Sequence, residues 1–130
     1  MAASKTSLSA GEVIRAALLD DKGVMARVNK IFPVVADSAE LPYISYRRAG
    51  FEQNPQKAGA PGADTIEFEV LCFTARYTEG VELAEAVRAA LDHATITQGD
   101  LRLRSCTLTD SEEAYQDDAY VQQLVFTVNI

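Results

Sequence analysis

Few residues of this sequence are of a type that carries out chemistry, and none has a suitable partner nearby. A nucleophile needs a base held beside it, yet the only histidine, His93, falls where a predicted helix ends. A cation is favoured at that end of a helix, so we expect His93 on the surface. The two cysteines, Cys72 and Cys106, fall in predicted strands without metal-ligand spacing. We expect two buried thiols in a reducing cytoplasm, with a disulfide between neighbouring strands as the alternative.

Adjacent acidic residues are the remaining candidates for acid–base catalysis or metal binding. They are the pairs Asp20–Asp21, Glu112–Glu113 and Asp117–Asp118. Neighbouring side chains point about 100° apart on a helix and to opposite faces of a strand, so neither arrangement converges on one ion. A calcium loop needs spaced oxygen ligands around a central glycine, which the run Asp110–Ala119 lacks. We therefore predict a solvated acidic turn there, no catalytic, cofactor or metal site, and no enzyme.

Composition indicates one globular domain and excludes several classes of protein. The chain has 130 residues, 48% apolar and 24% charged, which suits a single domain spanning residues 1–130. Its net charge of −7 disfavours binding to duplex phosphate. We expect solvated faces, rather than a specific nucleic-acid site, at Arg47–Arg48 and at the pair Arg102 and Arg104. No apolar run approaches the roughly 20 residues of a membrane helix, and residues 1–8 are predicted to be a frayed tail.

A change of hydrophobic period predicts the centre of the fold. In the stretch from Thr65 to Tyr77, every second residue from Ile66 to Cys72 is apolar, which is typical of a half-buried strand. From about residue 78 to 92, apolar residues recur every four positions, as in an amphipathic helix. The two sets are Ile66, Phe68, Val70, Cys72 and Leu83, Val87, Leu91. A strand that leads directly into such a helix favours an α+β fold with helices covering a sheet.

The rest of the pattern completes that expected fold. A first helix should follow Ser9, because Ser9 and Glu12 match the capping box S-x-x-E. Further strands are predicted at 31–35, 41–48, 101–109 and 120–130, the last two forming a hairpin with an acidic tip. The order is α-β-β-β-α-β-β: a mostly antiparallel sheet of about five strands with two helices packed on one face. Residues 49–64, rich in glycine and proline, are predicted to be a long flexible loop.

Four residues are candidates for contact with another subunit or partner. Leu71 and Phe73 occupy the face of the central strand opposite Cys72, and would be partly open if helices cover only the other face. Phe51 is the large apolar residue of the predicted loop, and Tyr115 stands within the acidic run. The alternative for Leu71 and Phe73 is that both faces of this strand are covered within the monomer.

Several segments together resemble a known family. They are VIRAALL from Val13, IFP from Ile31, LPYISY from Leu41, FEVLCF from Phe68 and ELAEAVRAAL from Glu82. In this order and spacing they resemble the tail-completion (tail terminator, head-to-tail joining) proteins of long-tailed phages and prophages. The most specific part is the pair IFP and LPYISY, and the similarity spans about Glu12 to Ile130.

The resemblance implies a structural protein of the virion, assembled in the bacterial cytoplasm. It implies a small α+β subunit that forms a ring, commonly a hexamer, capping the tail tube and docking to the head connector. The partners would be copies of itself, the tail tube and the connector, with no membrane and no cofactor. DNA would pass through the ring lumen without sticking to an acidic surface. Two alternatives remain: a stand-alone binding module for a host protein or small ligand, and an enzyme that uses scattered carboxylates.

Overall fold

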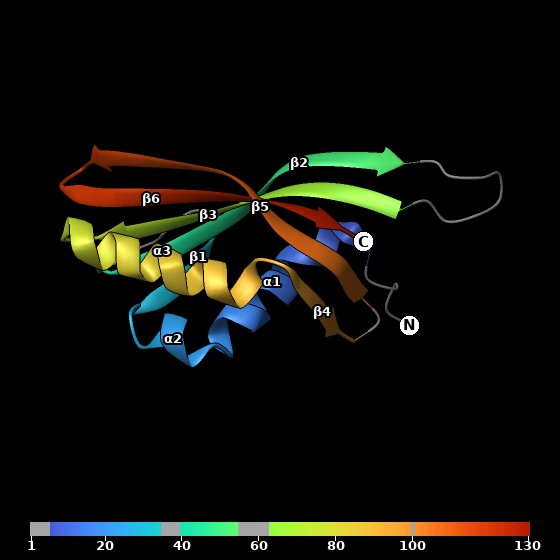
Figure 1. Ribbon diagram of the computed structural model, residues 1–130, viewed down its shortest axis with the longest axis horizontal. Helices are drawn as coiled ribbons and strands as arrows, with labels where there is room; N and C mark the ends of the chain where they lie inside the picture. The colour runs from blue at the N-terminus through green and yellow to red at the C-terminus, as the bar shows by residue number, and fades with distance from the viewer. Residues whose placement is uncertain (1–5, 35–39, 55–62, 100) are drawn as a thin grey trace.

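The computed structural model describes residues 6–34, 40–54, 63–99 and 101–130 (Figure 1). These form a six-stranded sheet in the spatial order β1-β2-β3-β6-β5-β4. The strands are β1 (Lys30–Pro33), β2 (Tyr43–Asn54), β3 (Ala63–Thr74), β4 (Ala94–Gln98), β5 (Leu101–Gln116) and β6 (Ala119–Asn129). The helices are the 3₁₀ turn η1 (Ser7–Ser9) and the α-helices α1 (Ala10–Leu19), α2 (Lys22–Met25) and α3 (Tyr77–Leu91).

The predicted α+β class and mostly antiparallel sheet are confirmed, and the prediction of about five strands and two helices differs in detail from the six strands and three α-helices of the described residues. Each strand pairing is antiparallel except that of β1 with β2. The additional strand is β4, which has five residues, follows α3 almost directly and carries one large apolar side chain, Ile96. The additional α-helix is α2, a single turn in which Oδ1 of Asp21 accepts a hydrogen bond from the Val24 N–H at 2.9 Å.

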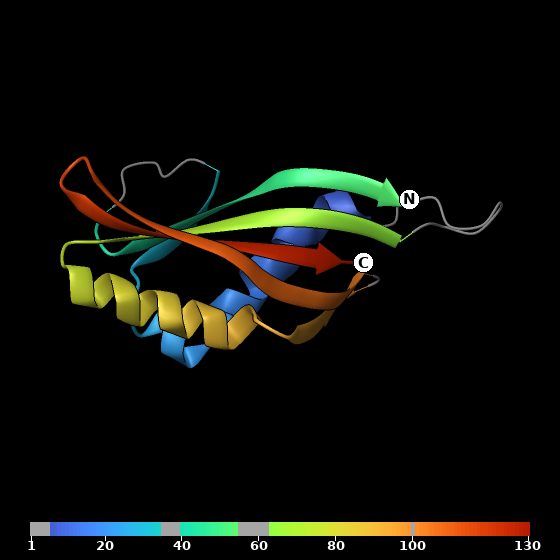
Figure 2. The ribbon, with the colours of Figure 1, turned by 45° about the horizontal axis from the view of Figure 1, so that its top comes forward.

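The hydrophobic core lies between the sheet and its helices, which all lie on the same face of the sheet (Figures 1 and 2). Phe68 and Val70 of β3 and Phe126 of β6 are fully buried at its centre. They pack with Ile14 and Leu18 of α1 and with Leu83, Val87 and Leu91 of α3. Full burial of each such side chain contributes about 1.5–3 kcal/mol to the stability of the fold. The helices are therefore held on this face, and the opposite face of the sheet is left without helical cover.

The predicted loop at residues 49–64 is wrong at both of its ends. β2 continues to Asn54 and β3 begins at Ala63, and the two strands pair along this length. A register shift between Arg48 and Gly50 breaks the alternation of side chains there, which is why the sequence does not resemble a strand. Residues 55–62 of the predicted loop lie outside the described residues.

The predicted frayed tail at residues 1–8 also ends too late. Ser7 begins η1 and is buried, and its Oγ donates a hydrogen bond to Oδ2 of Asp64 at 2.5 Å. Ser9 occupies the cap position of α1 but makes no side-chain capping bond, so the predicted capping box is not formed. Instead Oγ1 of Thr6 accepts from the Leu8 N–H at 3.3 Å, one turn earlier. Residues 1–5 lie outside the described part.

The acidic run forms a strand and a tight turn rather than an irregular segment. β5 continues to Gln116 and pairs with β6 up to Ala119. Asp117 and Asp118 make the turn, with φ angles of 51° and 61°. Two left-handed residues between antiparallel strands match the twist of a hairpin. The predicted hairpin with an acidic tip is confirmed, and we call it the acidic hairpin.

Both cysteines are buried and free, as predicted. Cys72 lies on β3 and Cys106 on β5, with β6 between these strands, so the alternative of a disulfide between neighbouring strands is wrong. Burial raises the pKa of the Cys72 thiol, and burial followed by the nearby charge of Asp92 raises the pKa of Cys106 to about 12. Protonated, enclosed thiols are poor nucleophiles.

Candidate contact surface

The face of the sheet opposite the helices carries an apolar area at the end nearest the acidic hairpin. Its residues come from four neighbouring strands, because Tyr43 pairs with Phe73, Phe73 with Val121, and Val121 with Ala114. Leu71 lies two residues before Phe73 on the same face. We call these five residues, Tyr43, Leu71, Phe73, Ala114 and Val121, the open-face patch.

The open-face patch is ordered and hollowed. The rings of Tyr43 and Phe73 stack with 4.6 Å between their centroids, and Phe32 meets the edge of Tyr43 at 5.9 Å. A cavity of about 210 Å³ is lined by Leu71, Phe73, Ala114 and Val121 with polar side chains of β5 and β6. A second cavity of about 260 Å³ adjoins it through Phe73 and reaches Leu41. The patch is therefore preformed and concave, as a contact surface for a protruding partner would be.

A polar network borders the open-face patch on the side away from the acidic hairpin. Glu69 is only 8% exposed, although it lies on the open face. Its Oε2 accepts from Nη2 of Arg47 and its Oε1 from Nε2 of Gln123, both at 2.8 Å. The two hydrogen bonds hold this carboxylate in place, and it in turn fixes the side chains beside Leu71. An apolar centre with a satisfied polar margin is the usual anatomy of a protein interface.

The structure brings together two of the four predicted contact residues. Leu71 and Phe73 are half-buried neighbours in one cavity. Tyr115 is 59% exposed at the same end of the molecule, and its ring meets the edge of Tyr120. Phe51 is also exposed, but it lies opposite Ile66 near the other end of β2. Phe51 and Tyr115 therefore each lie on a surface separate from that of Leu71 and Phe73.

Sequence reasoning missed several residues that share these surfaces. Tyr43 and Val121 of the open-face patch alternate with the buried residues Ile44 and Gln122, and this period of two was the signal that could have found them. The sequence pattern places Tyr77 only at the boundary between a predicted strand and a predicted helix. Its hydroxyl donates to Oε2 of Glu113 at 2.6 Å, a contact across 36 positions that no local pattern indicates.

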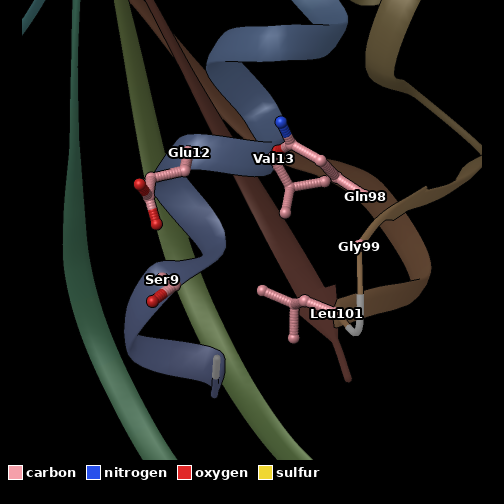
Figure 3. Close-up of a pocket in the computed structure, with 6 residues that line it drawn as sticks. All are labelled: Ser9, Glu12, Val13, Gln98, Gly99 and Leu101. Carbon is pink, nitrogen blue, oxygen red and sulfur yellow. The ribbon is translucent and has the colours of Figure 1, made fainter. Parts of the chain in front are cut away.

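A second hollow lies on the helix side, between α1 and the turn that joins β4 to β5 (Figure 3). Ser9, Glu12 and Val13 of the N-terminal segment face Gln98, Gly99 and Leu101 across about 180 Å³. It continues along α1 as a groove of about 360 Å³ beside Ala17 and Ile96. Glu12 is the one titratable side chain of the first hollow and Asp20 that of the second, so no acid and base meet in either.

The other candidates for chemistry are spread over the molecule. Within the described ranges, no three His, Cys, Asp or Glu side chains lie close enough to hold a metal ion. The side chain of His93 is 80% exposed, and its Nε2 lies 3.5 Å from Oδ2 of Asp92. None of the described helices has the length and apolar character needed to cross a membrane.

A family model described as tail completion protein gp17 matches residues 12–130. The chain belongs to that family. A solved chain described as "Virion of native gene transfer agent (GTA) particle" superposes with a TM-score of 0.81. The superposition covers 95% of this chain and 98% of that chain at 20% sequence identity, which shows a shared fold. A search of curated proteins found no match.

Membership confirms the resemblance seen in the sequence. This tail completion protein is a structural component of the virion, with a role at the tail terminator or head–tail joint. It therefore assembles with other tail and head proteins. The open-face patch offers such a role a preformed surface that includes apolar and aromatic side chains.

Proposed function

We propose that copies of this tail completion protein close into a ring at the end of the tail tube and offer that ring to the head connector. The observation that carries this proposal is the open-face patch, where Leu71 and Phe73 line one hollow and Tyr43 stacks on Phe73, on a sheet face without helical cover (Figure 2). Apolar area of this kind in a soluble protein usually marks a contact surface. We expect six copies, as the family resemblance implies.

The edges of the sheet suit a closed ring. Among the described residues, β4 pairs only with β5, and the outer half of β2, beyond Tyr46, pairs only with β3. Such edges invite pairing with further strands, and cyclic symmetry satisfies each subunit without growth into fibres. Phe51 lies on this outer half of β2 and is 49% exposed. We assign it to contact with a neighbouring subunit or partner, separate from the open-face patch.

The proposed role involves no catalysis and no cofactor. A net charge of −7 would let DNA pass through the lumen of the ring without being retained. A ring whose lumen is lined with lysine and arginine would contradict this part of the proposal. Assembly in the bacterial cytoplasm, where the tail and head proteins meet, follows from the same role.

The test replaces Leu71 and Phe73 by aspartate together. Two charges in the open-face patch should prevent ring closure, because a buried unpaired charge is strongly disfavoured. We expect particles produced with this variant to contain heads and tails that are not joined, counted by electron microscopy, and the purified variant to sediment as a monomer. The matched control, Ala26→Asp with Ala89→Asp, adds the same charge at two exposed positions of the helix side.

The variant must first be shown to fold. Leu71 and Phe73 are half-buried, so circular dichroism and a cooperative thermal transition should persist. If the folded variant supports normal joining of heads and tails, the open-face patch is not the assembly surface. A stand-alone binding module would instead give a monomer at every concentration, with particle production unaffected.

A further inference from the structure

A small aromatic pocket lies on the helix side of the acidic hairpin and borders the open-face patch at Ala114. It measures about 200 Å³ and is lined by Tyr77 at the start of α3, by Glu113, Ala114 and Tyr115 of β5, and by Tyr120 and Gln122 of β6. We call it the tyrosine pocket. It holds three of the five tyrosines of the chain. Tyr77 and Tyr115 are 46% and 59% exposed, so the hydrophobic core does not explain their presence.

The three rings are held by one another. Tyr120 lies between the other two, with its centroid 6.0 Å from Tyr77 and 4.9 Å from Tyr115. The ring planes are inclined by 74° and 63°, so ring faces and ring edges both border the hollow. A ring face carries negative electrostatic potential and attracts a cation placed within about 6 Å.

A carboxylate is fixed in the wall of the tyrosine pocket. Oε2 of Glu113 accepts from Nε2 of Gln122 at 2.7 Å and from Oη of Tyr77 at 2.6 Å. These two hydrogen bonds, that of Gln122 first, lower the pKa of Glu113, so the group is charged at neutral pH. Both bonds end on Oε2. Oε1 therefore keeps lone pairs for a donor that enters the pocket.

The surroundings of the tyrosine pocket are also negative. Asp117 and Asp118 form the turn of the same hairpin, and Asp110 and Glu112 lie on the other face of β5. The nearest described cation along the chain is Arg76, whose Nε is directed to Oε1 of Glu79 at 3.9 Å. A partner that approaches this end of the molecule therefore meets aromatic faces and uncompensated carboxylates.

We propose that the tyrosine pocket receives an arginine side chain from a neighbouring, different protein of the virion. A planar guanidinium stacks on phenol rings and donates to a carboxylate at the same time, which an ammonium group does less well. We commit to a different protein because a second copy, also at −7, would bring like charge to the acidic hairpin, and this contact, unlike that at the open-face patch, is itself ionic. The inference rests on the proposed assembly role, since it names the chemistry of a partner surface.

The test uses a probe of that chemistry, the peptide Ac-Gly-Arg-Gly-NH₂, titrated into the full chain. Signals of the rings of Tyr77, Tyr115 and Tyr120, observed by NMR, should shift and saturate at millimolar peptide. The peptide with glutamine in place of arginine should leave them unchanged. Glu113→Gln should weaken binding roughly five- to tenfold, as expected for a lost charge-assisted hydrogen bond. The matched control is Glu112→Gln, which removes the same charge on the other face of β5 and should change affinity less than about twofold.

Three results would overturn the proposal. One is an equal response to the glutamine and arginine peptides; another is an equal loss in the Glu112→Gln and Glu113→Gln variants. The third is a change in the oligomeric size of the purified protein on Glu113→Gln substitution, because a second copy would then be the occupant. Failure of the proposed assembly role would give a different result. The variant Leu71→Asp with Phe73→Asp would then produce normal particles, and the wild-type protein would still bind the arginine peptide.

Discussion

Asp92 shows how one side chain connects two elements of this fold. It follows the last residue of α3, and its Oδ1 accepts a hydrogen bond from the Leu108 N–H of β5 at 2.9 Å. Its Oδ2 lies 3.3 Å from Nε of Arg88 on the preceding turn. The Leu108 bond first, and then Arg88 and His93, hold the pKa of Asp92 below its usual range. The charged form of Asp92 is thus favoured in the folded protein.

This low pKa gives a testable dependence of stability on pH. Because the folded pKa is lowered, the contribution of Asp92 is complete above its unfolded pKa of about 3.9 and is lost as the pH falls through the folded value. Asp92→Asn keeps an acceptor but removes the charge, so we expect it to lower the free energy of unfolding by about 1 kcal/mol at pH 7. Urea denaturation should show the difference from wild type shrinking towards pH 3.

The control for this prediction is Glu85→Gln, which removes a charge from an exposed position of the same helix. It should change stability by less than about 0.5 kcal/mol. A difference between wild type and Asp92→Asn that stays constant from pH 7 to pH 3 would show that the charge of Asp92 contributes nothing.

At the scale of elements, the junction of β3 and α3 depends on Gly80. A methyl group at Gly80 would lie 2.9 Å from Oγ1 of Thr74. That oxygen cannot move freely, because Thr74 is buried and donates to the Arg76 carbonyl at 2.8 Å. We expect Gly80→Ala to destabilise the protein by about 1–3 kcal/mol through overpacking, against a gain in helix propensity of at most about 1 kcal/mol.

Gly11 of α1 provides the matched control for Gly80. A methyl group there would lie 3.5 Å from the ring of Tyr46, which is ordinary contact. Gly11→Ala should therefore raise the free energy of unfolding by about 0.5–1 kcal/mol. Thermal melts of both variants check the pair, and an equal stabilisation of both would show that the β3–α3 junction is not tightly packed.

The elements that the sequence predicts well are those whose period is unbroken. Ile66 to Cys72 and Leu83 to Leu91 keep a single period throughout, and both elements lie where the pattern placed them. The extension of β2 was not predictable because the bulge at Ala49 shifts the alternation by one residue. The short α2 depends on one side-chain cap from Asp21, and β4 is too short for a period to show.

The two contact surfaces likewise differ in how far the sequence predicts them. Leu71 and Phe73 could be placed on a common face from alternation alone, and the structure places them in one cavity. The tyrosine pocket could not be foreseen as a unit. Tyr77 meets Glu113 only because α3 packs under the hairpin of β5 and β6, so the contact follows from tertiary packing and not from spacing.

At the scale of the whole molecule, two unlike surfaces share one end. The open-face patch is apolar and lies on the side of the sheet without helices, while the tyrosine pocket lies on the helix side of the same acidic hairpin. A subunit could therefore contact a neighbouring copy with one surface and a different protein with the other. Because one contact is apolar and the other ionic, the two should respond oppositely to salt.

We expect salt to strengthen the contact between copies and to weaken the arginine contact. Raising sodium chloride from about 0.1 M to about 1 M shortens the Debye length from about 10 Å to about 3 Å. Screening lowers the repulsion between chains that each carry −7, so sedimentation should show a larger fraction of assembled protein. The same change should weaken binding of the arginine peptide to the tyrosine pocket, because attraction to Glu113 is screened. Dissociation of the assembled protein at high salt would mean that ionic pairs, rather than Leu71 and Phe73, hold the copies together.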